Sequence, residues 1–276
     1  MSRNSAAKPR RLAASHQRSW LWGRHAVLET LTAGHWPVIE LLLDEELPVD
    51  VVRQVQQLVS RTPLRFERVL GDRLTDLCRS EEHQGFLARM GEFPCRSFQD
   101  LKDLLRSSPP ATDQDFLRPK LPLFLVCDRI QDAHNFGAIL RSCAAMHVDG
   151  VVIGEGFQVS VTPHVARASA GAVNHLTLFR VPNLSDALAA MKTCGIQTVA
   201  ATEKSADPVW GCNLNQAEAV VIGSEATGIA PELLADCDRQ VAIPMPGPIE
   251  SLNAAVAAGI VLYECRRQQA SGNQAN

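Results

Sequence analysis

Residues 121–141 read LPLFLVCDRIQDAHNFGAILR, and this stretch carries the signal that decides the fold class. Its first part, Leu123 to Asp128, is an apolar run that ends in an acid, which is typical of a buried strand. A polar loop follows, and from Asn135 to Met146 apolar side chains recur at helical spacing. A buried strand that leads through a loop into a helix predicts one half of a βαβ unit.

The same alternation of strand and helix continues toward the end of the chain. Apolar runs predict further strands at Gly150 to Ile153, Leu176 to Val181, Thr198 to Thr202, Ala219 to Gly223 and Val241 to Met245. Helical spacing predicts helices at Pro163 to Ala170, Ser185 to Cys194, Pro231 to Asp236 and Ser251 to Gln268. We therefore expect an α/β fold, a mostly parallel sheet with helices on both faces. In such sheets ligands bind beyond the carboxyl ends of the strands.

The composition suggests five segments along the chain. Residues 1–19 form a basic arm, for which we consider a disordered tail, an RNA contact or a transit peptide. Residues 20–93 form a small mixed α/β unit, 94–120 a proline-interrupted linker with one short helix, 121–268 the parallel-sheet domain and 269–276 a tail. In the small unit we expect helices at Ala26 to Leu31 and Val51 to Val59, and strands at Val38 to Leu43 and Gly85 to Arg89.

Charge, hydropathy and cysteine usage exclude several classes of protein. The 27 basic and 30 acidic residues give a net charge of −3, which argues against a protein that coats nucleic acid over its whole surface. Apolar runs such as Ala254 to Tyr263 fall well short of the roughly 20 residues that a membrane span needs. The eight cysteines form no CxxC pair or zinc-ligand cluster, so we expect free thiols, no metal and a cytoplasmic protein.

Three polar clusters follow three of the predicted strands. The first runs from Asp128 to Arg141, from the end of a strand into a helix, and a helix cap at Asn135 with a solvated or ion-paired Arg141 is the simple alternative. The second runs from Val220 to Gly228, a buried strand that ends in a loop whose glycines let backbone groups come close to a ligand, although a generic α/β loop would look similar. The third, Ile243 to Asn253, ends at a helix amino terminus, which favours oxygen-rich ligands but is also explained by capping. The chain has no GxGxxG motif, so a nicotinamide dehydrogenase has little support.

Taken together and in this order, the three clusters resemble the SpoU (TrmH-type) branch of the SPOUT RNA methyltransferases. The family motifs run approximately N-x-G-A-I-x-R, then G-S-E-x-x-G, then I-P-M-x-G-x-x-x-S-L-N. In this chain they match Asn135 to Arg141, Gly223 to Gly228 and Ile243 to Asn253. Residues 168–172, ASAGA, resemble another segment of the family. The chain departs from the family pattern at Ala226, where glycine is usual, and at Ala255, where serine is frequent. If position 226 needs a positive φ, the alanine there would change the loop.

Two stretches of the small unit extend the resemblance. Gly23 to Glu29 and His83 to Ala88 resemble the RNA substrate-binding domain that is fused ahead of the catalytic domain in one subgroup. That subgroup includes the 23S rRNA guanosine 2′-O-methyltransferase. The resemblance therefore implies methylation of a ribose 2′-hydroxyl, with a guanosine of large-subunit rRNA as the expected substrate. A tRNA ribose methyltransferase, and a non-catalytic RNA-binding factor of ribosome assembly, are the alternatives.

The resemblance also implies a carboxyl-terminal trefoil knot, a homodimer, S-adenosylmethionine as the methyl donor and no metal. We expect the dimer interface to include the small-residue face of the last helix, Ala254 to Gly259. The implied catalytic residues are Asn135, Arg141, Glu225, Ser251 and Asn253. The implied donor-binding residues are Thr202, Gly223, Ser224, Glu225, Ile243, Met245, Gly247, Ser251 and Leu252. Arg141 is either a general base or an electrostatic stabiliser, and we favour the second because a guanidinium keeps its proton and is a poor base.

Overall fold

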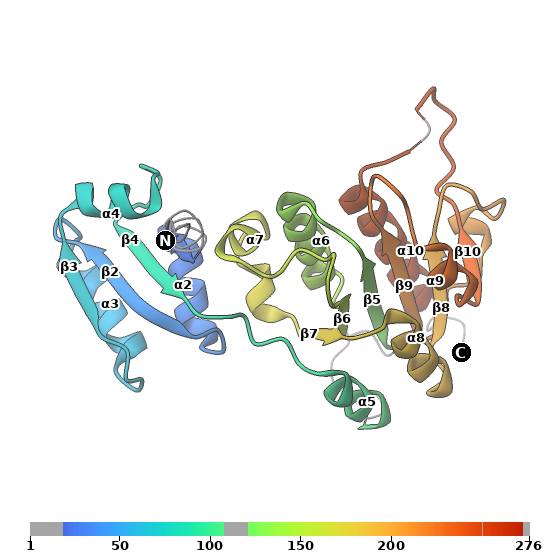
Figure 1. Ribbon diagram of the computed structural model, residues 1–276, viewed down its shortest axis with the longest axis horizontal. Helices are drawn as coiled ribbons and strands as arrows, with labels where there is room; N and C mark the ends of the chain where they lie inside the picture. Colours follow the sequence, from blue (N-terminus) through green and yellow to red (C-terminus); the bar gives the residue numbers. More distant parts are fainter. Residues whose placement is uncertain (1–18, 108–120, 250, 273–276) are drawn as a thin grey trace, which may run out of the picture. The chain divides into compact units, whose positions relative to one another are not determined.

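The computed structural model describes residues 19–107, 121–249 and 251–272 (Figure 1). Most of the expected basic arm and parts of the expected linker and tail lie outside these residues. The described residues form two compact units, one of residues 19–94 with 161–174 and one of residues 95–160 with 175–272.

The larger unit is built on a six-stranded sheet in which every pair of neighbouring strands is parallel. The strand order is β10-β8-β9-β5-β6-β7. The bounds are Leu123–Asp128 for β5, Gly150–Gly154 for β6, Leu178–Val181 for β7, Gln197–Ala201 for β8, Glu218–Gly223 for β9 and Arg239–Val241 for β10. The expected α/β class is thus confirmed. The connection after β5 leads to β6 on one side of the sheet and the connection after β9 leads to β10 on the other side, and open α/β sheets place ligands at such a point, between β5 and β9.

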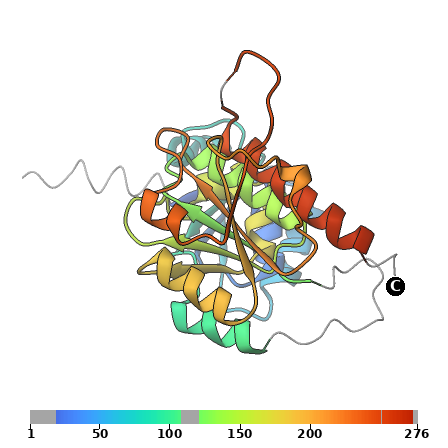
Figure 2. The same cartoon turned by 90° about the vertical axis from the view of Figure 1, so that its right-hand side faces the viewer.

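Helices cover both faces of this sheet (Figure 2). On one face α6 packs against α10, and on the other α5, α8 and α9 share a core with the strands. The bounds are Phe98–Ser107 for α5, Ala133–Ala145 for α6, Leu184–Thr193 for α8, Pro231–Ala235 for α9 and Ala254–Gly272 for α10. Alternate side chains of each strand enter the two layers, as Phe124 and Val126 do on the α8 side. A continuous apolar strand sequence is therefore required, and β5 is buried along its whole length.

The end of the sheet nearest the third motif differs from the expectation. We expected a strand from Val241 to Met245, whereas β10 ends at Val241 and Ile243 and Met245 lie in the following loop. Pro244 explains the difference, because a proline has no N–H to donate to a neighbouring strand. The last helix also begins later than expected, at Ala254, so Ser251 precedes it.

The smaller unit contains a four-stranded mixed sheet of order β1-β4-β2-β3. Its strands are Trp20–Trp22 (β1), Val38–Asp44 (β2), Phe66–Val69 (β3) and Phe86–Met90 (β4), with helices Arg24–Ala33 (α2), Val49–Val59 (α3) and Gly71–Cys78 (α4). The expected elements are present, while β1, β3 and α4 were not predicted. Strand β3 is short and lies at the edge, with Glu67 and Arg68 exposed, so it lacks a periodic apolar signal.

Residues 161–174, between β6 and β7 in the sequence, pack inside the smaller unit. This segment contains α7 (Pro163–Ala168), and a 3-10 turn follows at Ala172–His175. Val165 and Val173 are fully buried, and the Asn174 side chain donates to Thr30 Oγ1 at 3.1 Å. The Arg167 guanidinium lies 3.9 Å from the centre of the Trp22 ring. A fragment of the larger domain alone, starting near Pro119, would therefore expose Val165 and Val173, because the residues that bury them belong to the smaller unit.

The structure bears on the expected thiols, metals and membrane spans. All eight cysteines are free, and four of them are buried. Among the described residues no cluster of His, Cys, Asp or Glu could hold a metal, and no helix is long and apolar enough to span a bilayer. The trefoil knot implied by the resemblance stays a prediction.

One buried acid at the amino end of β9 makes stability depend on pH. Glu218 is fully buried, and neither carboxyl oxygen has a hydrogen-bond partner among the described residues. Burial raises the pKa of Glu218 to about 8, although Arg239 opposes the shift. The folded chain therefore keeps this proton up to about pH 8, while the unfolded chain releases it near the ordinary value of 4.5.

We predict that Glu218→Gln removes a pH dependence of stability. In the wild type, the free energy of unfolding should fall by up to about 1.4 kcal/mol per pH unit as pH rises from about 5 to 8. The variant should lack this slope and be the more stable form at pH 8. Denaturant titration across this range measures it. Glu264→Gln is the control, because pairing with Arg267 lowers the pKa of Glu264 and places its titration below the range. An unchanged slope in Glu218→Gln would contradict the prediction.

Candidate functional site

The loop after β9 is the tightest part of the site. A Cβ atom on Gly223 would overlap the backbone of Gly228 and Ile229, so only glycine fits there. The N–H of Gly228 donates to the carbonyl of Ser224 at 2.8 Å and closes the loop. Gly228 itself has φ 65°, a left-handed conformation that favours glycine. The glycines of this motif thus serve first to fold the loop back on its own strand.

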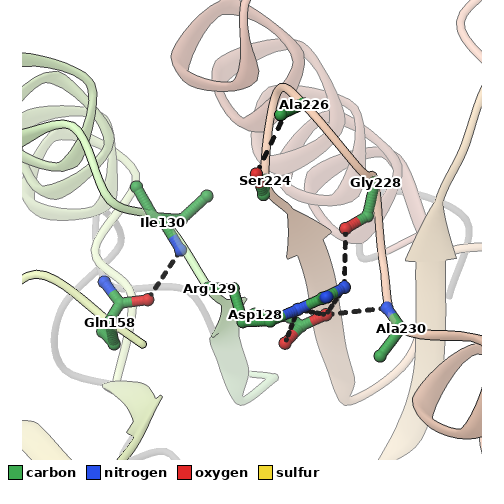
Figure 3. Close-up of polar contacts among 8 residues, drawn as sticks. All are labelled: Asp128, Arg129, Ile130, Gln158, Ser224, Ala226, Gly228 and Ala230. Atoms are coloured by element: carbon green, nitrogen blue, oxygen red, sulfur yellow. Dashed lines mark hydrogen bonds and ion pairs between the residues drawn. The ribbon is translucent and has the colours of Figure 1, made fainter. Parts of the chain in front are cut away.

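Ala226 fits this loop without strain. It is not among the non-glycine residues with positive φ, so the alanine occupies an ordinary backbone conformation. Its N–H donates to Ser224 Oγ at 3.2 Å (Figure 3). The departure from the family pattern at this position therefore leaves the turn intact.

Hydrogen bonds bring residues of all three motifs together. The Asn135 Nδ2 amide on α6 donates to Glu225 Oε1 in the loop after β9. Asn253 Nδ2, just before α10, donates to Asn135 Oδ1 at 2.9 Å. We call Asn135, Glu225 and Asn253 the amide–carboxylate cluster. Glu225 and Asn253 are exposed and Asn135 is half-buried, so their remaining donors and acceptors are open to a ligand.

Helix capping accounts for some of these residues but not for Asn135. The N-cap of α6 is Asp132, whose Oδ1 accepts the N–H of Asn135 at 2.8 Å. Asn253 does cap α10, because its Oδ1 accepts the N–H of Ala255 at 2.9 Å. The capping hypothesis is therefore wrong for Asn135, whose side chain is committed to the cluster, and holds in part for Asn253.

A separate pocket lies at the carboxyl ends of β8 and β10. Its lining includes five of the expected donor-binding residues, Thr202, Ile243, Met245, Ser251 and Leu252. Gly247 lines an adjoining open hollow together with Ile243 and Met245. Gly223, Ser224 and Glu225 do not line the pocket and belong to the loop after β9. The pocket and the amide–carboxylate cluster are linked through the short stretch 251–253.

The chemistry of this pocket suits a nucleoside that carries an apolar chain. Ile243, Met245 and Leu252 supply apolar surface, and Thr202 supplies a hydroxyl. Among the described residues, no hydrogen bond uses the backbone N–H of Ile243, Met245 or Leu252. Unsatisfied N–H groups beside apolar surface can bind the edge and face of a purine ring. The residues present therefore fit S-adenosylmethionine without a charged fingerprint.

Two expected catalytic residues lie outside the amide–carboxylate cluster: Ser251 lines the pocket, and Arg141 lies on another side of α6. Arg141 follows Asn135 by six residues, which places it about 240° around the helix at about 100° per residue. The Arg141 side chain is exposed. The single chain thus brings together Asn135, Glu225 and Asn253, but neither Arg141 nor Ser251.

Asp128 and Arg129, at the end of β5, were not predicted as site residues. Arg129 has φ 56°, and its guanidinium pairs with Asp128 and donates to the Gly228 carbonyl at 3.3 Å (Figure 3). The acid at the strand end was visible in the sequence. The left-handed turn at an arginine was not, since nothing local in the sequence marks it.

Two family profiles match this chain and show which protein family it belongs to. The profile of the SpoU rRNA methylase family matches residues 122–263, and that of an RNA 2′-O ribose methyltransferase substrate-binding domain matches residues 20–94. The chain belongs to the SpoU family. The first match spans all three motifs and includes residues 161–174, which pack in the smaller unit.

Individual SpoU family relatives match most of the chain. A Bacillus subtilis protein assigned to the TrmH family of tRNA/rRNA methyltransferases is 31% identical over 92% of this chain and 98% of its own length. The SpoU methyltransferase AviRb from Streptomyces viridochromogenes, solved in complex with AdoMet, is 26% identical over 97% of this chain and 96% of its own, with a TM-score of 0.71. The TrmH/SpoU tRNA modifying enzyme of A. aeolicus is 27% identical but covers 63% of this chain and 83% of its own, with a TM-score of 0.50.

We predict that Gly223→Ala destabilises this SpoU family chain by overpacking the loop against Gly228. Overpacking costs about 1–3 kcal/mol, so the melting temperature should fall by roughly 5 °C. Gly247→Ala is the matched control, because a Cβ there meets nothing within 4 Å. Calorimetric melting of the two variants tests this prediction, and equal melting temperatures would contradict it.

Proposed function

We propose that this chain transfers a methyl group from S-adenosylmethionine to a ribose 2′-hydroxyl of RNA. The observation that carries the proposal is the amide–carboxylate cluster, which joins residues of the three family motifs. Its member Asn253 lies two residues after Ser251, which lines the pocket. Family membership gives RNA methylation, and the AdoMet complex of AviRb supports the donor. The cluster argues against a non-catalytic factor, since a lost activity would not preserve all three motifs in contact.

The chain's own residues have three tasks in this reaction. The donor supplies a methyl group on a sulfonium, and the pocket of Thr202, Ile243, Met245 and Leu252 would hold it, with Ser251 completing its lining two residues before Asn253. Asn135 would orient the ribose hydroxyl, and Glu225 fixes the direction of the Asn135 amide by accepting one of its N–H groups. Holding the two reactants in line supplies much of the rate of such a displacement.

Arg141 has the third task, the stabilisation of charge. A guanidinium stays protonated at any physiological pH, so it cannot take the hydroxyl proton. It can bind the phosphate next to the target ribose and stabilise the alkoxide that develops as the hydroxyl proton passes to solvent water, which the exposed cluster admits. Its exposed place on α6, with no partner among the described residues, leaves it available for an RNA phosphate.

A guanosine of large-subunit rRNA is our preferred substrate, with tRNA as the second candidate. The substrate-binding profile over residues 20–94 supports an RNA substrate, and the fusion of such a domain ahead of the catalytic domain favours rRNA. The A. aeolicus tRNA modifying enzyme covers less than two thirds of this chain, which also favours rRNA. The smaller unit carries arginines and no lysine between residues 20 and 93, and arginine suits bidentate phosphate contacts and stacking on unpaired bases. Arg24, Arg53 and Arg61 are exposed.

Mapping of ribose methylation tests the substrate and Arg141 together. In cells that lack this protein, we expect one 2′-O-methyl site in 23S-type rRNA to disappear and to return with the wild-type gene. Arg141→Ala should not restore it, because loss of such a stabiliser lowers kcat by about two orders of magnitude or more. The affinity of the variant for S-adenosylmethionine should be nearly normal.

Three outcomes decide between the candidates. A site lost from tRNA would establish the second candidate. Full restoration by Arg141→Ala would remove the arginine from the mechanism. An unchanged methylation pattern in both RNAs would contradict the proposed function.

We also propose that the chain forms a homodimer through the outer face of α10. Val256 and Tyr263 of α10 and the neighbouring Trp210 are 50%, 57% and 63% exposed, and they border a hollow of about 650 Å³. Exposed apolar patches of this kind mark interaction sites. Asn135 and Asn253 line the same hollow, so a second copy seated there would lie beside the amide–carboxylate cluster.

The structure corrects the side of α10 that can face a partner. Ala258, which we expected in the interface, is fully buried in its own chain. A bulky residue at that position would disrupt the fold rather than the dimer. The residues available to a partner are those on the opposite side of the helix, Val256, Ile260 and Tyr263.

We predict that Ile260→Arg converts a dimer to a monomer. A charge in an apolar interface is not compensated, so light scattering should report about 30.1 kDa for the variant and twice that for the wild type. Ile39→Arg is the control, because Ile39 is also exposed but lies on β2. A wild type that is monomeric at micromolar concentration, or an Ile260→Arg that stays dimeric, would contradict this interface.

A further inference from the structure

We infer that Asp128 and Arg129 are positioning residues that hold the loop 224–228, and through it Glu225, in the geometry the reaction needs. We call this pair the 128–129 clamp. The inference rests on the proposed function, because the family motifs assign the loop to the active site. Neither residue touches the amide–carboxylate cluster, so the clamp acts through the backbone of the loop.

The first half of the clamp depends on the backbone turn at Arg129. In an extended strand, successive side chains point to opposite faces, so Asp128 and Arg129 could not meet. Arg129 has φ 56°, and this left-handed turn brings its guanidinium back to the carboxylate of Asp128. Nε lies 3.1 Å from Oδ1 and 3.2 Å from Oδ2, and Nη2 lies 3.1 Å from Oδ2. A conformation that arginine rarely adopts is thus used to form a bidentate pair.

The second half of the clamp holds the segment that returns from the loop (Figure 3). Asp128 Oδ2 accepts the N–H of Ala230 at 2.7 Å, and Arg129 Nη2 donates to the Gly228 carbonyl at 3.3 Å. Each member of the pair therefore binds one backbone group beyond the turn. Since the Gly228 N–H also bonds to Ser224, fixing Gly228 fixes both ends of the loop.

Burial makes the pair a unit rather than two surface charges. The Asp128 side chain is 7% exposed, and that of Arg129 is 34% exposed. A carboxylate so far from water needs the guanidinium as its partner. Arg129 also begins the connection from β5 to α6, the helix that carries Asn135. The clamp therefore sets the position of loop 224–228 relative to α6, so that Glu225 can accept the hydrogen bond from Asn135.

Arg129→Asn tests the clamp with the least change to the backbone. Asparagine tolerates a left-handed φ, so the turn is kept while the guanidinium is lost. We expect amide hydrogen exchange of residues 224–228, measured without any ligand, to become about tenfold faster. The kcat should fall about tenfold, because Glu225 no longer holds the Asn135 amide in place, while the Kd for S-adenosylmethionine and the KM for RNA stay within about twofold, because loop 224–228 does not line the donor pocket.

Arg106→Gln is the matched control. Arg106 forms a surface pair with Asp103 on α5, which packs against β7 and α8, and its variant should leave loop exchange and kcat unchanged. Should Arg129→Asn fail to fold, Arg129→Lys decides, since its single ammonium cannot bond Asp128 and Gly228 together and should still loosen the loop.

The outcomes separate the clamp from the proposed function. Loop exchange that matches the wild type in a folded Arg129 variant would overturn the clamp, whatever the activity. Faster loop exchange in a protein whose wild type binds no S-adenosylmethionine would support the clamp as a loop anchor and contradict the proposed function instead. A lower melting temperature with unchanged loop exchange and kcat would overturn the clamp and assign Arg129 to stability alone.

Discussion

The candidate site depends on the two hydrogen bonds that the side-chain amide of Asn135 forms. One end of this amide donates to Glu225 and the other accepts from Asn253, so one side chain ties a helix after β5 to the loop after β9 and to the start of α10. These segments are about 90 and 118 residues away along the chain. Parallel strands make the meeting possible, because their carboxyl ends lie on the same edge of the sheet. The 128–129 clamp and the glycine at 223 then hold the Glu225 loop within reach of that amide.

The pocket that we propose for the methyl donor and the amide–carboxylate cluster are neighbouring parts of one edge of the sheet. The pocket uses apolar side chains and backbone groups that follow β8 and β10, while the cluster uses polar side chains that follow β5 and β9. This division suits a reaction in which a charged donor and a ribose hydroxyl must be aligned rather than covalently activated. In residues 20–93 every Lys/Arg-type cation is an arginine, interspersed with acidic residues, so the proposed RNA contacts of the smaller unit depend on the placement of individual arginines rather than on its net charge.

The sequence was sufficient for the features that depend on local pattern. Buried parallel strands such as β5 are continuous apolar runs, and their order with the intervening helices predicted the sheet. The three motifs predicted which residues gather, and Asn135, Glu225 and Asn253 do meet. Features that depend on tertiary context were not predictable. The left-handed Arg129, the burial of Ala258 and the packing of residues 161–174 in the smaller unit depend on contacts with distant segments. The end of β10 was missed for a local reason, because an apolar run suggested a strand where Pro244 prevents one.

The central claim is that the site at the carboxyl ends of β5, β8, β9 and β10 catalyses methylation of a ribose hydroxyl. Purified protein should be incubated with S-adenosylmethionine that carries a deuterated methyl group and with protein-free rRNA and tRNA. The RNA is then digested to nucleosides and analysed by mass spectrometry. The account predicts label on the ribose of a 2′-O-methyl nucleoside in one of the two RNAs. Label on a base, or no label in either RNA from protein that binds the donor, would contradict it.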